Sequence, residues 1–508
     1  MLDVLVIGSG YGGAAIAARL APHASVLVVE RGRWWRPGQF PHGVAAMCRT
    51  YRTRRNPTGL WGVRLGRGTG VGYASAVGGS SAVNYGITSR PDDHVFAGWP
   101  VSAAALAPYF ARAREVLRPT PSPRAVALGD RAFLDRVEPG RRVDLENTID
   151  WDRCDDCGRC VPGCNRGAKR ALDQTYLALA LAAGAELRVE TEVRGLVPLR
   201  DGGHAVELRA AGGGPEWVRA RQVVLAAGTL GTLDLVHRSH LAVGPGFGQR
   251  LSLNGDGLAF LYDTPHALSS HAGAPISTSV RIPFTDEDGR VRTLMVMSGR
   301  VPAAASRFAA AALAALAGTI GDDPGRSAHA PHPLRRRLRD LAIVDSGGAL
   351  SRSFMYKLDA QDRGRGTARF TGAGVVIDWP DYADDPILRF AGERLRAWAA
   401  AAGGTVVPDV ARLPGMRSFS VHPLGGCRMA CSIDDGVVDD VGRVFHPGGG
   451  VHAGLRIADG SIVPEALGVP PSWTITALAE RIADDLIREL ATSDRPQRSA
   501  SATSTSRT

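Results

Sequence analysis

The sequence has almost no lysine: of its 60 lysines and arginines, only Lys169 and Lys357 are lysines. The formal net charge of +10 therefore comes from arginine, which is scattered along the chain apart from one cluster at 335–339. Nucleic-acid-binding proteins combine a basic face with a recognition motif, and this chain has no such motif. Scattered charge is weak evidence for a partner, so we expect no nucleic-acid binding.

Long hydrophobic runs are also absent. No stretch of about 18 apolar residues occurs, so no transmembrane segment is predicted. The N-terminus lacks the basic stretch, apolar core and cleavage site of a secretory signal, and an apolar run at Val4–Ile7 begins almost at Met1. These features predict a cytoplasmic protein, in which the seven cysteines are not expected to form structural disulfides.

The length of 508 residues predicts two interleaved lobes. Apolar runs separated by glycine turns predict several strands over 186–225, and apolar positions at helical spacing predict a helix over 471–490. Residues 303–345 begin with an alanine-rich helical pattern, which fits a packed helix, a lid over a pocket or a membrane-surface helix. In residues 492–508 apolar residues do not recur at a regular spacing, which predicts a disordered tail.

A glycine-rich turn follows the first apolar run. Gly8, Gly10 and Gly13 fit the pattern G-x-G-x-x-G, a small-residue helix follows, and Glu30 ends the next apolar run. In a dinucleotide-binding turn these glycines allow the tight turn, the approach of the pyrophosphate and the packing of the helix, while the acidic residue binds the ribose. With strand, helix and acid all in place, the sequence predicts a dinucleotide site. The turn does not distinguish FAD from NAD.

Further motifs follow in order along the chain. They are GVG at 70–72, VGGSSAVNYG at 77–86, VVLAAGTLG at 223–231, NGD at 254–256, HPLGGCRM at 422–429, DVGRV at 440–444, LRIADGS at 455–461 and PSWTITALAER at 471–481. Their order and spacing resemble the glucose-methanol-choline (GMC) oxidoreductases, nearest the cholesterol-oxidase-like branch. The resemblance covers about residues 3–490, with the middle third poorly matched.

The resemblance implies an α/β fold class with an α+β substrate lobe. We expect a Rossmann-like FAD-binding domain and a second, substrate-binding domain built on a mostly antiparallel sheet. The expected boundaries are 1–95, 186–256 and 437–491 for the discontinuous FAD-binding domain, 96–185 for a cysteine-containing connecting segment, and 257–436 for the substrate-binding domain.

The same resemblance implies which residues contact FAD. The glycine segment at 77–86 would cover the flavin, the strand end at 223–231 would pass the adenosine, and the helix that starts near 471 would point its N–H groups at the flavin ring. The implied residues are Gly78, Gly79, Asn84, Ala227, Gly228, Asp459, Gly460, Pro471, Ser472 and Thr474.

His422 matches the family's catalytic histidine. Oxidation of an alcohol needs a base for the hydroxyl proton and an acceptor for the hydride, which is the flavin N5. An imidazole titrates near neutral pH and can take that proton.

Pro470 departs from the family pattern. Relatives usually have Asn or His at this position, donating a hydrogen bond to the substrate oxygen, whereas proline offers no donor. The sequence therefore predicts catalysis by His422 alone or with a donor from elsewhere, and it weakens the case for cholesterol itself as substrate.

Four cysteines, Cys154, Cys157, Cys160 and Cys164, have the spacing C-x2-C-x2-C-x3-C. This is the spacing of bacterial ferredoxins, although Asn165 replaces the usual proline. One [4Fe–4S] cluster, a zinc site and packed thiols all remain open.

The predicted function is that of an FAD-dependent oxidoreductase acting on the CH–OH group of a small alcohol. A sterol or another hydrophobic secondary alcohol is the expected substrate, and oxygen or an acceptor protein would take the electrons. Two alternatives stay open. One is a flavin-binding scaffold that has lost catalysis, and the other is an isomerase or desaturase-type flavin enzyme.

Overall fold

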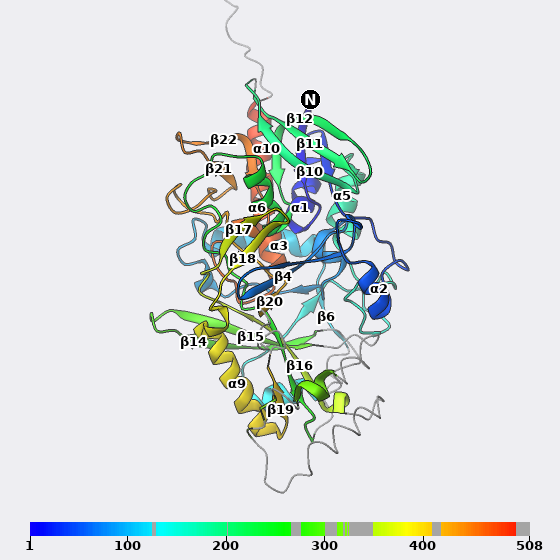
Figure 1. The fold of residues 1–508 in the computed structure, drawn as a ribbon, viewed down its shortest axis with the longest axis vertical. Helices are drawn as coiled ribbons and strands as arrows, with labels where there is room; N and C mark the ends of the chain where they lie inside the picture. Colours follow the sequence, from blue (N-terminus) through cyan, green and yellow to red (C-terminus); the bar gives the residue numbers. More distant parts are fainter. Residues whose placement is uncertain are drawn as a thin grey trace, which may run out of the picture.

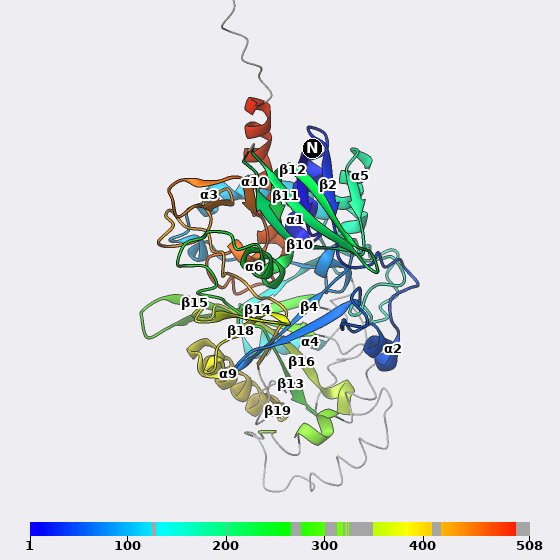
Figure 2. The ribbon, with the colours of Figure 1, turned by 45° about the horizontal axis from the view of Figure 1, so that its top comes forward.

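The computed structural model describes residues 1–123, 129–200, 202–265, 276–299, 312–317, 321–322, 324, 349–408 and 418–493. Two sheets occupy different halves of the molecule, one beside the N-terminus and one around β14–β16 (Figure 1). The turned view in Figure 2 shows the same division. Most of the 303–345 stretch and residues 494–508 of the expected tail lie outside the described residues.

The first sheet has the order β10-β11-β12-β1-β2-β9, with β22 beside β12 and β21 beside β22. Its centre is parallel, because β1 pairs in parallel with β2 and β12, while β10, β11 and β12 form antiparallel pairs at one edge. The strands are β1 (Leu2–Ile7), β2 (Val26–Val29), β9 (Glu186–Arg188), β10 (Thr191–Pro198), β11 (His204–Ala210), β12 (Pro215–Leu225), β21 (Arg443–Phe445) and β22 (Val451–Ile457). The apolar runs in β1 and β2 are buried, as expected for parallel strands covered on both faces.

Helices pack around this sheet. They are α1 (Tyr11–Leu20), α3 (Ala103–Leu117), α5 (Tyr176–Ala182), α6 (Gly228–Arg238) and α10 (Ser472–Ser493). Helix α1 packs against α5 and α10, and α10 also packs against α3. The dinucleotide turn and the C-terminal helix, far apart in sequence, therefore lie side by side.

The second sheet has the order β19-β13-β16-β15-β14-β7, and all of its neighbours are antiparallel. Its strands are β7 (Arg142–Asp144), β13 (Gly257–Tyr262), β14 (Thr278–Thr285), β15 (Val291–Gly299), β16 (Phe354–Ala360) and β19 (Thr405–Val407). The helix α9 (Pro386–Ala402) packs against it. β7 comes from the segment expected to be a connector, so that segment also supplies an edge strand; the exact domain boundaries stay a prediction.

Smaller elements join the two halves. They are β3 (Trp61–Leu65), β4 (Thr69–Ala74) and β20 (Ser418–Ser420) in one sheet, β5 (Ile87–Thr88), β6 (Thr120–Pro121) and β8 (Glu146–Asn147) in another, the hairpin β17 (Thr367–Thr371) and β18 (Gly374–Asp378), and the helices α2 (Gly43–Arg49) and α4 (Gly129–Val137). In the part of the chain that the structure describes, no helix has both the length and the apolar character to cross a membrane.

A buried carboxylate ties four of the helices together. Glu480 on α10 is fully buried and accepts hydrogen bonds from Arg19 of α1 at 2.8 Å and from Tyr176 of α5 at 2.5 Å. Arg112 of α3 lies 2.9 Å from the same carboxylate. Charged hydrogen bonds of this kind are stronger than neutral ones, so Glu480 stabilises the arrangement of helices beside the sheet.

Replacing Glu480 should weaken this half of the molecule. We expect Glu480→Ala to lower the free energy of unfolding by about 1.5–3 kcal/mol, the range for hydrogen bonds to a charged group, since both arginines are partly exposed and water replaces part of the lost interaction. Chemical denaturation of the purified protein measures this. Glu115→Ala on the exposed face of α3 is the control and should change the value by less than about 0.5 kcal/mol. Equal effects of the two changes would contradict the role given to Glu480.

Candidate active site

The glycine-rich turn between β1 and α1 makes two tight backbone contacts. A Cβ on Gly8, whose φ is +101°, would lie 2.2 Å from the carbonyl oxygen of Ala226, and one on Gly13 would lie 2.0 Å from that of Gly8. Gly10 differs, because a Cβ there would meet no atom within 4 Å, although Gly10 is the N-cap of α1. The N-terminus of α1 therefore faces open space, as a pyrophosphate site requires.

Glu30 lies directly after β2, beside this turn. Its carboxylate accepts hydrogen bonds from the backbone N–H of Ser9 at 3.1 Å, from the Ser9 hydroxyl at 2.7 Å and from the N–H of Gly32 at 2.8 Å. These bonds fix the turn at the carboxyl ends of β1 and β2. The contact of Glu30 with a ribose stays a prediction.

The predicted flavin-covering segment lies over the same turn. Gly78 and Gly79 have φ values of +83° and +55°, and a Cβ on Gly79 would lie 2.9 Å from the Cα of Gly10. Further along, the side-chain amide of Asn84 donates to the hydroxyl of Tyr11 at 2.8 Å. The structure thus brings the first two sequence motifs into contact.

Two later motifs reach the turn from the opposite side. Ala227 is the N-cap of α6 and Gly228 begins that helix with a φ of +75°. Asp459 caps the short turn that begins at Gly460. A Cβ on Gly12 would lie 1.5 Å from the carbonyl oxygen of residue 458, so the 458–460 turn rests on the first turn of α1.

The start of α10 completes the group. Pro471 precedes the helix, and the hydroxyl of Ser472 donates to the carbonyl oxygen of Ile87 at 3.3 Å. The hydroxyl of Thr474 is buried and has no hydrogen-bond partner among the described residues. Because a buried hydroxyl without a partner costs free energy, Thr474 suits contact with a bound group.

These features fit FAD. The open space at Gly10 suits the pyrophosphate, and the partnerless Thr474 hydroxyl lies in the first turn of a 22-residue helix that would face the flavin ring. The contact of each residue with FAD remains a proposal.

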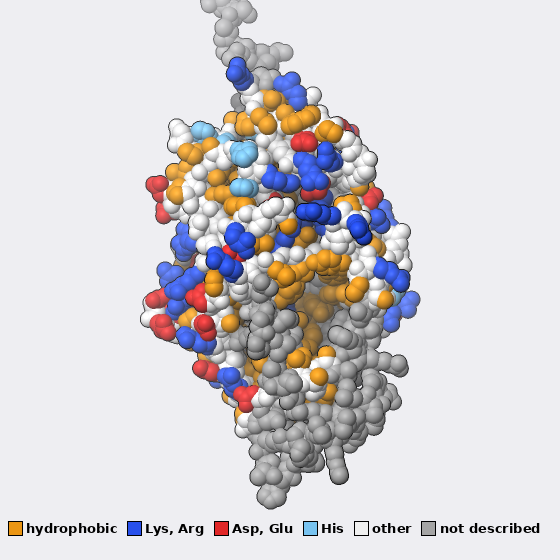
Figure 3. All heavy atoms as spheres, in the orientation of Figure 1, with side chains coloured by type: hydrophobic (Ala, Val, Ile, Leu, Met, Phe, Trp, Pro, Cys, Tyr) orange, Lys and Arg blue, Asp and Glu red, His pale blue; other side chains and the backbone are white. Residues whose placement is uncertain are grey.

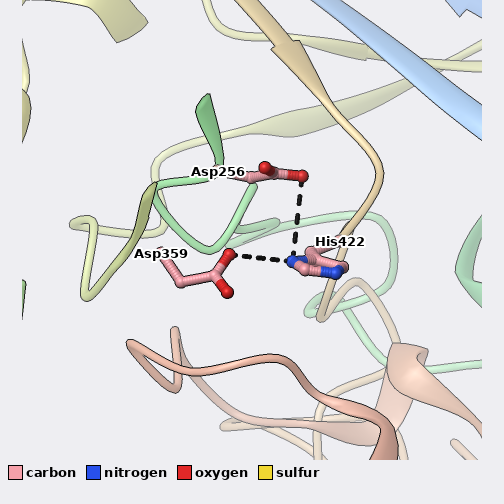
Figure 4. Close-up of side chains that lie close together, drawn as sticks. All are labelled: Asp256, Asp359 and His422. Atoms are coloured by element: carbon pink, nitrogen blue, oxygen red, sulfur yellow. Dashed lines mark hydrogen bonds and ion pairs between the residues drawn. The ribbon is translucent and has the colours of Figure 1, made fainter. Parts of the chain in front are cut away.

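His422 lies in a buried polar cluster with Asp256 and Asp359 (Figure 4). Its Nδ1 is 2.9 Å from Oδ1 of Asp359 and 3.7 Å from Oδ2 of Asp256. Because a carboxylate only accepts, Nδ1 carries a hydrogen, and in the neutral form of the imidazole Nε2 then keeps its lone pair. The backbone N–H of His422 donates to Ser420 Oγ at 2.9 Å, which fixes the backbone as well as the ring.

Lys357 on β16 supplies the positive charge of this cluster. Its ammonium donates to Asp256 and, at 3.0 Å, to Oδ1 of Asp359. Burial opposes ionisation of Lys357 and of Asp256, yet the pKa of Lys357 is raised by the two carboxylates and the pKa of Asp256 is lowered, chiefly by Lys357 and then by His422. The two carboxylates and the imidazole have a spacing that could hold a cation, but the ammonium already lies between the carboxylates.

One oxygen atom of the cluster has no hydrogen-bond partner among the described residues. Asp359 is fully buried, and its Oδ2 has no hydrogen-bond donor among the described residues. A buried carboxylate oxygen without a donor is costly, so this oxygen is a candidate acceptor for a hydrogen bond that the protein itself does not supply.

Asn254 holds the loop that precedes Pro470. The side-chain amide of Asn254 donates to the carbonyl oxygen of Val469 at 2.8 Å, and its oxygen accepts from the N–H groups of Leu467 and Gly468. Two residues later, Asp256 accepts from the N–H of Val421 at 2.6 Å. The 254–256 motif therefore holds both the His422 segment and the segment that ends at Pro470.

Sequence reasoning missed Lys357 and Asp359. They lie in the poorly matched middle third, and nothing in the local pattern of β16 distinguishes them. One signal was present, because Lys357 is one of two lysines in a chain that otherwise uses arginine. The other, Lys169, is also buried, and donates to the carbonyl oxygens of Ala82, Asn84 and Cys160.

The four clustered cysteines line one small cavity. The other residues that line it are Ile149, Gly158 and Ala168 and the charged residues Asp155, Asp156, Arg159, Arg166 and Lys169. All four are half-buried and none forms a disulfide. Burial raises the pKa of the Cys160 thiol to about 12, so this cysteine is no nucleophile in its metal-free form.

Family models for GMC oxidoreductases match the chain in two parts, at residues 43–254 and 388–479. Among curated proteins, the cholesterol oxidase of Acinetobacter baumannii is 26% identical, covering 94% of this chain and 93% of its own length. The long-chain-alcohol oxidase of Arabidopsis thaliana is also 26% identical, covering 96% of this chain and 67% of its own length.

Solved structures agree on the fold. Pyridoxine 4-oxidase from Mesorbium loti superposes with a TM-score of 0.64 at 18% identity, covering 96% of this chain and 99% of that structure. The predicted fold class, with one mixed α/β half and a second half on an antiparallel sheet, is confirmed. With both family models matched in the expected order, the chain belongs to the GMC oxidoreductase family.

Proposed function

We propose that this protein oxidises the CH–OH group of an alcohol, with His422 taking the hydroxyl proton. FAD, when bound, supplies the hydride acceptor at flavin N5. The observation that carries the proposal is the 2.9 Å hydrogen bond between Nδ1 of His422 and Asp359, because it leaves Nε2 as the free acceptor on a histidine that matches the family's catalytic one.

The cluster around His422 suits a base. As the imidazole gains a proton it becomes cationic, and the carboxylates of Asp359 and Asp256 at 2.9 and 3.7 Å stabilise that charge. Lys357 offsets part of the negative charge of the two carboxylates.

A hydrophobic alcohol is the proposed substrate. The face of the molecule drawn in Figure 3 is hollowed near its middle, and hydrophobic side chains gather in the hollow. Apolar pockets with a few placed polar groups are typical of sites for small hydrophobic ligands. The names of two relatives specify cholesterol and long-chain alcohols, which supports a sterol or a similarly apolar alcohol.

A second candidate rests on Pro470. Its ring offers no donor to the substrate oxygen, and the loop before it is held in place by Asn254. A flavin-binding protein with lost or altered catalysis, of scaffold, isomerase or desaturase type, would also tolerate this proline.

FAD binding is tested at Gly10. We expect Gly10→Val to abolish FAD retention, because its side chain would enter the space of the pyrophosphate while meeting no protein atom at Cβ. The ratio of flavin to protein absorbance, together with circular dichroism, measures the loss in a folded chain. Gly214→Val is the matched control, since a Cβ there also meets nothing within 4 Å. Normal flavin content in Gly10→Val would refute the dinucleotide site.

The role of His422 is tested by anaerobic flavin reduction with an alcohol panel. His422→Ala should keep FAD and slow reduction by about 10²–10⁴-fold, the usual contribution of a general base. Asp359→Asn should also slow it strongly, by up to about 10⁴-fold, because an amide can donate to Nδ1 and favour the wrong tautomer.

The surface variant His23→Ala is the control and should leave the rate unchanged. An unchanged rate in His422→Ala would show that another group takes the proton.

Pro470→Asn separates the two candidates. If the alcohol mechanism operates without a donor at 470, the added amide should speed reduction by simple secondary alcohols about 10–100-fold, as one hydrogen bond of about 1.5–3 kcal/mol to a developing alkoxide implies. Stopped-flow reduction at matched FAD occupancy measures this. No reduction by any alcohol, in either form, would favour altered catalysis.

A further inference from the structure

The loop that carries Cys154, Cys157, Cys160 and Cys164 is separate from the His422 cluster and takes no part in the proposed alcohol chemistry. The loop is held in place by backbone hydrogen bonds, from Asp150 to the carbonyl of Ala168 at 2.7 Å and from Arg170 to that of Thr148 at 2.8 Å. The four side chains line one cavity. Four cysteines that line one cavity without forming a disulfide could serve as a ligand set.

The spacing of the sulfur atoms argues against a single metal ion. A tetrahedral zinc site with Zn–S of about 2.3 Å places its sulfurs about 3.8 Å apart. Among the described residues, only Asp256, Asp359 and His422 bring three ligand atoms within 4.8 Å of one another, so no three of these sulfurs lie that close. A cubane cluster binds each thiolate to a different iron, and its cysteine sulfurs are correspondingly farther apart.

Lys169 provides a second, independent observation. It lines the same cavity and is only 3% exposed. Its ammonium donates to three carbonyl oxygens, those of Cys160, Ala82 and Asn84, at 2.8–3.2 Å. Asp173 acts on this ammonium electrostatically, but the two form no ion pair in the described part of the chain, and a buried cation without a close anion is costly.

An iron–sulfur cluster would supply that anion. Four thiolates outweigh the positive charge of a [4Fe–4S] core, so the bound cluster is negative and lies beside the Lys169 ammonium. Neutral thiols would leave the ammonium without a nearby anion, whereas any divalent metal core bound by four thiolates would be negative. The charge of Lys169 therefore supports a thiolate-bound metal centre, and the spacing of the sulfurs distinguishes a cluster from a single ion.

We infer that Cys154, Cys157, Cys160 and Cys164 hold one [4Fe–4S] cluster, with Lys169 as the charge that faces it. The site is a second redox centre close to the FAD cradle. Lys169 joins Cys160 to Asn84, and Asn84 in turn contacts Tyr11 on α1.

Metal and sulfide analysis of the full chain, purified without oxygen, tests this site. The expected result is about four irons and four acid-labile sulfides per chain, with a paramagnetic resonance signal appearing after reduction by dithionite. If the purified chain lacks iron, it is incubated with ferrous iron, sulfide and a thiol, and the same content is then expected. One zinc per chain without sulfide, or no iron after reconstitution, would overturn the inference.

Matched variants locate the site and separate it from the flavin chemistry. Cys157→Ser should lower iron and sulfide together, whereas Cys431→Ser, at an exposed cysteine outside the loop, should leave both unchanged. Equal loss in both variants would refute the assignment. Gly10→Val should lose FAD and keep the iron, so failure of the FAD proposal and failure of the cluster proposal give different results.

Discussion

The buried ammonium of Lys357 is the charge on which the centre of the molecule depends. It lies between Asp256 and Asp359, two buried carboxylates that would otherwise repel each other where water cannot screen them. With the ammonium present, Asp256 can accept from the backbone of Val421 and Asp359 from the ring of His422. A single cation thereby links β16, the start of β13 and the His422 loop.

The two lysines of this chain share a physical requirement. Each is buried and donates to three acceptor groups from several directions. A compact ammonium can point its hydrogens in three directions, whereas the wide planar guanidinium of arginine needs more room and a flat arrangement of acceptors. This explains why lysine occurs at these two positions in a sequence that otherwise uses arginine.

The FAD cradle depends on close contact between backbones. Segments near residues 8–13, 78–84, 226–228 and 458–460 approach so closely that a Cβ at Gly8, Gly12, Gly13 or Gly79 would overlap a neighbouring backbone atom. Packing between distant segments therefore requires glycine at 8, 12 and 79, and the close fit of the turn itself requires it at 13, whereas Gly10 faces open space. The same motif thus contains glycines of two kinds, structural and ligand-facing.

The sequence by itself determined the family and the fold class, because the glycine turns, the His422 motif and the α10 motif are local patterns that can be recognised along the chain. The same patterns predicted most of the residues of the candidate site. The sequence could not reveal Asp359 and Lys357 as partners of His422, since they lie more than sixty positions away on a strand with no distinctive pattern. It also left the metal at the cysteine run open, because spacing along the chain does not determine distances between sulfurs. Those relations are decided by strand pairing and by which buried charges meet, and only the tertiary structure contains them.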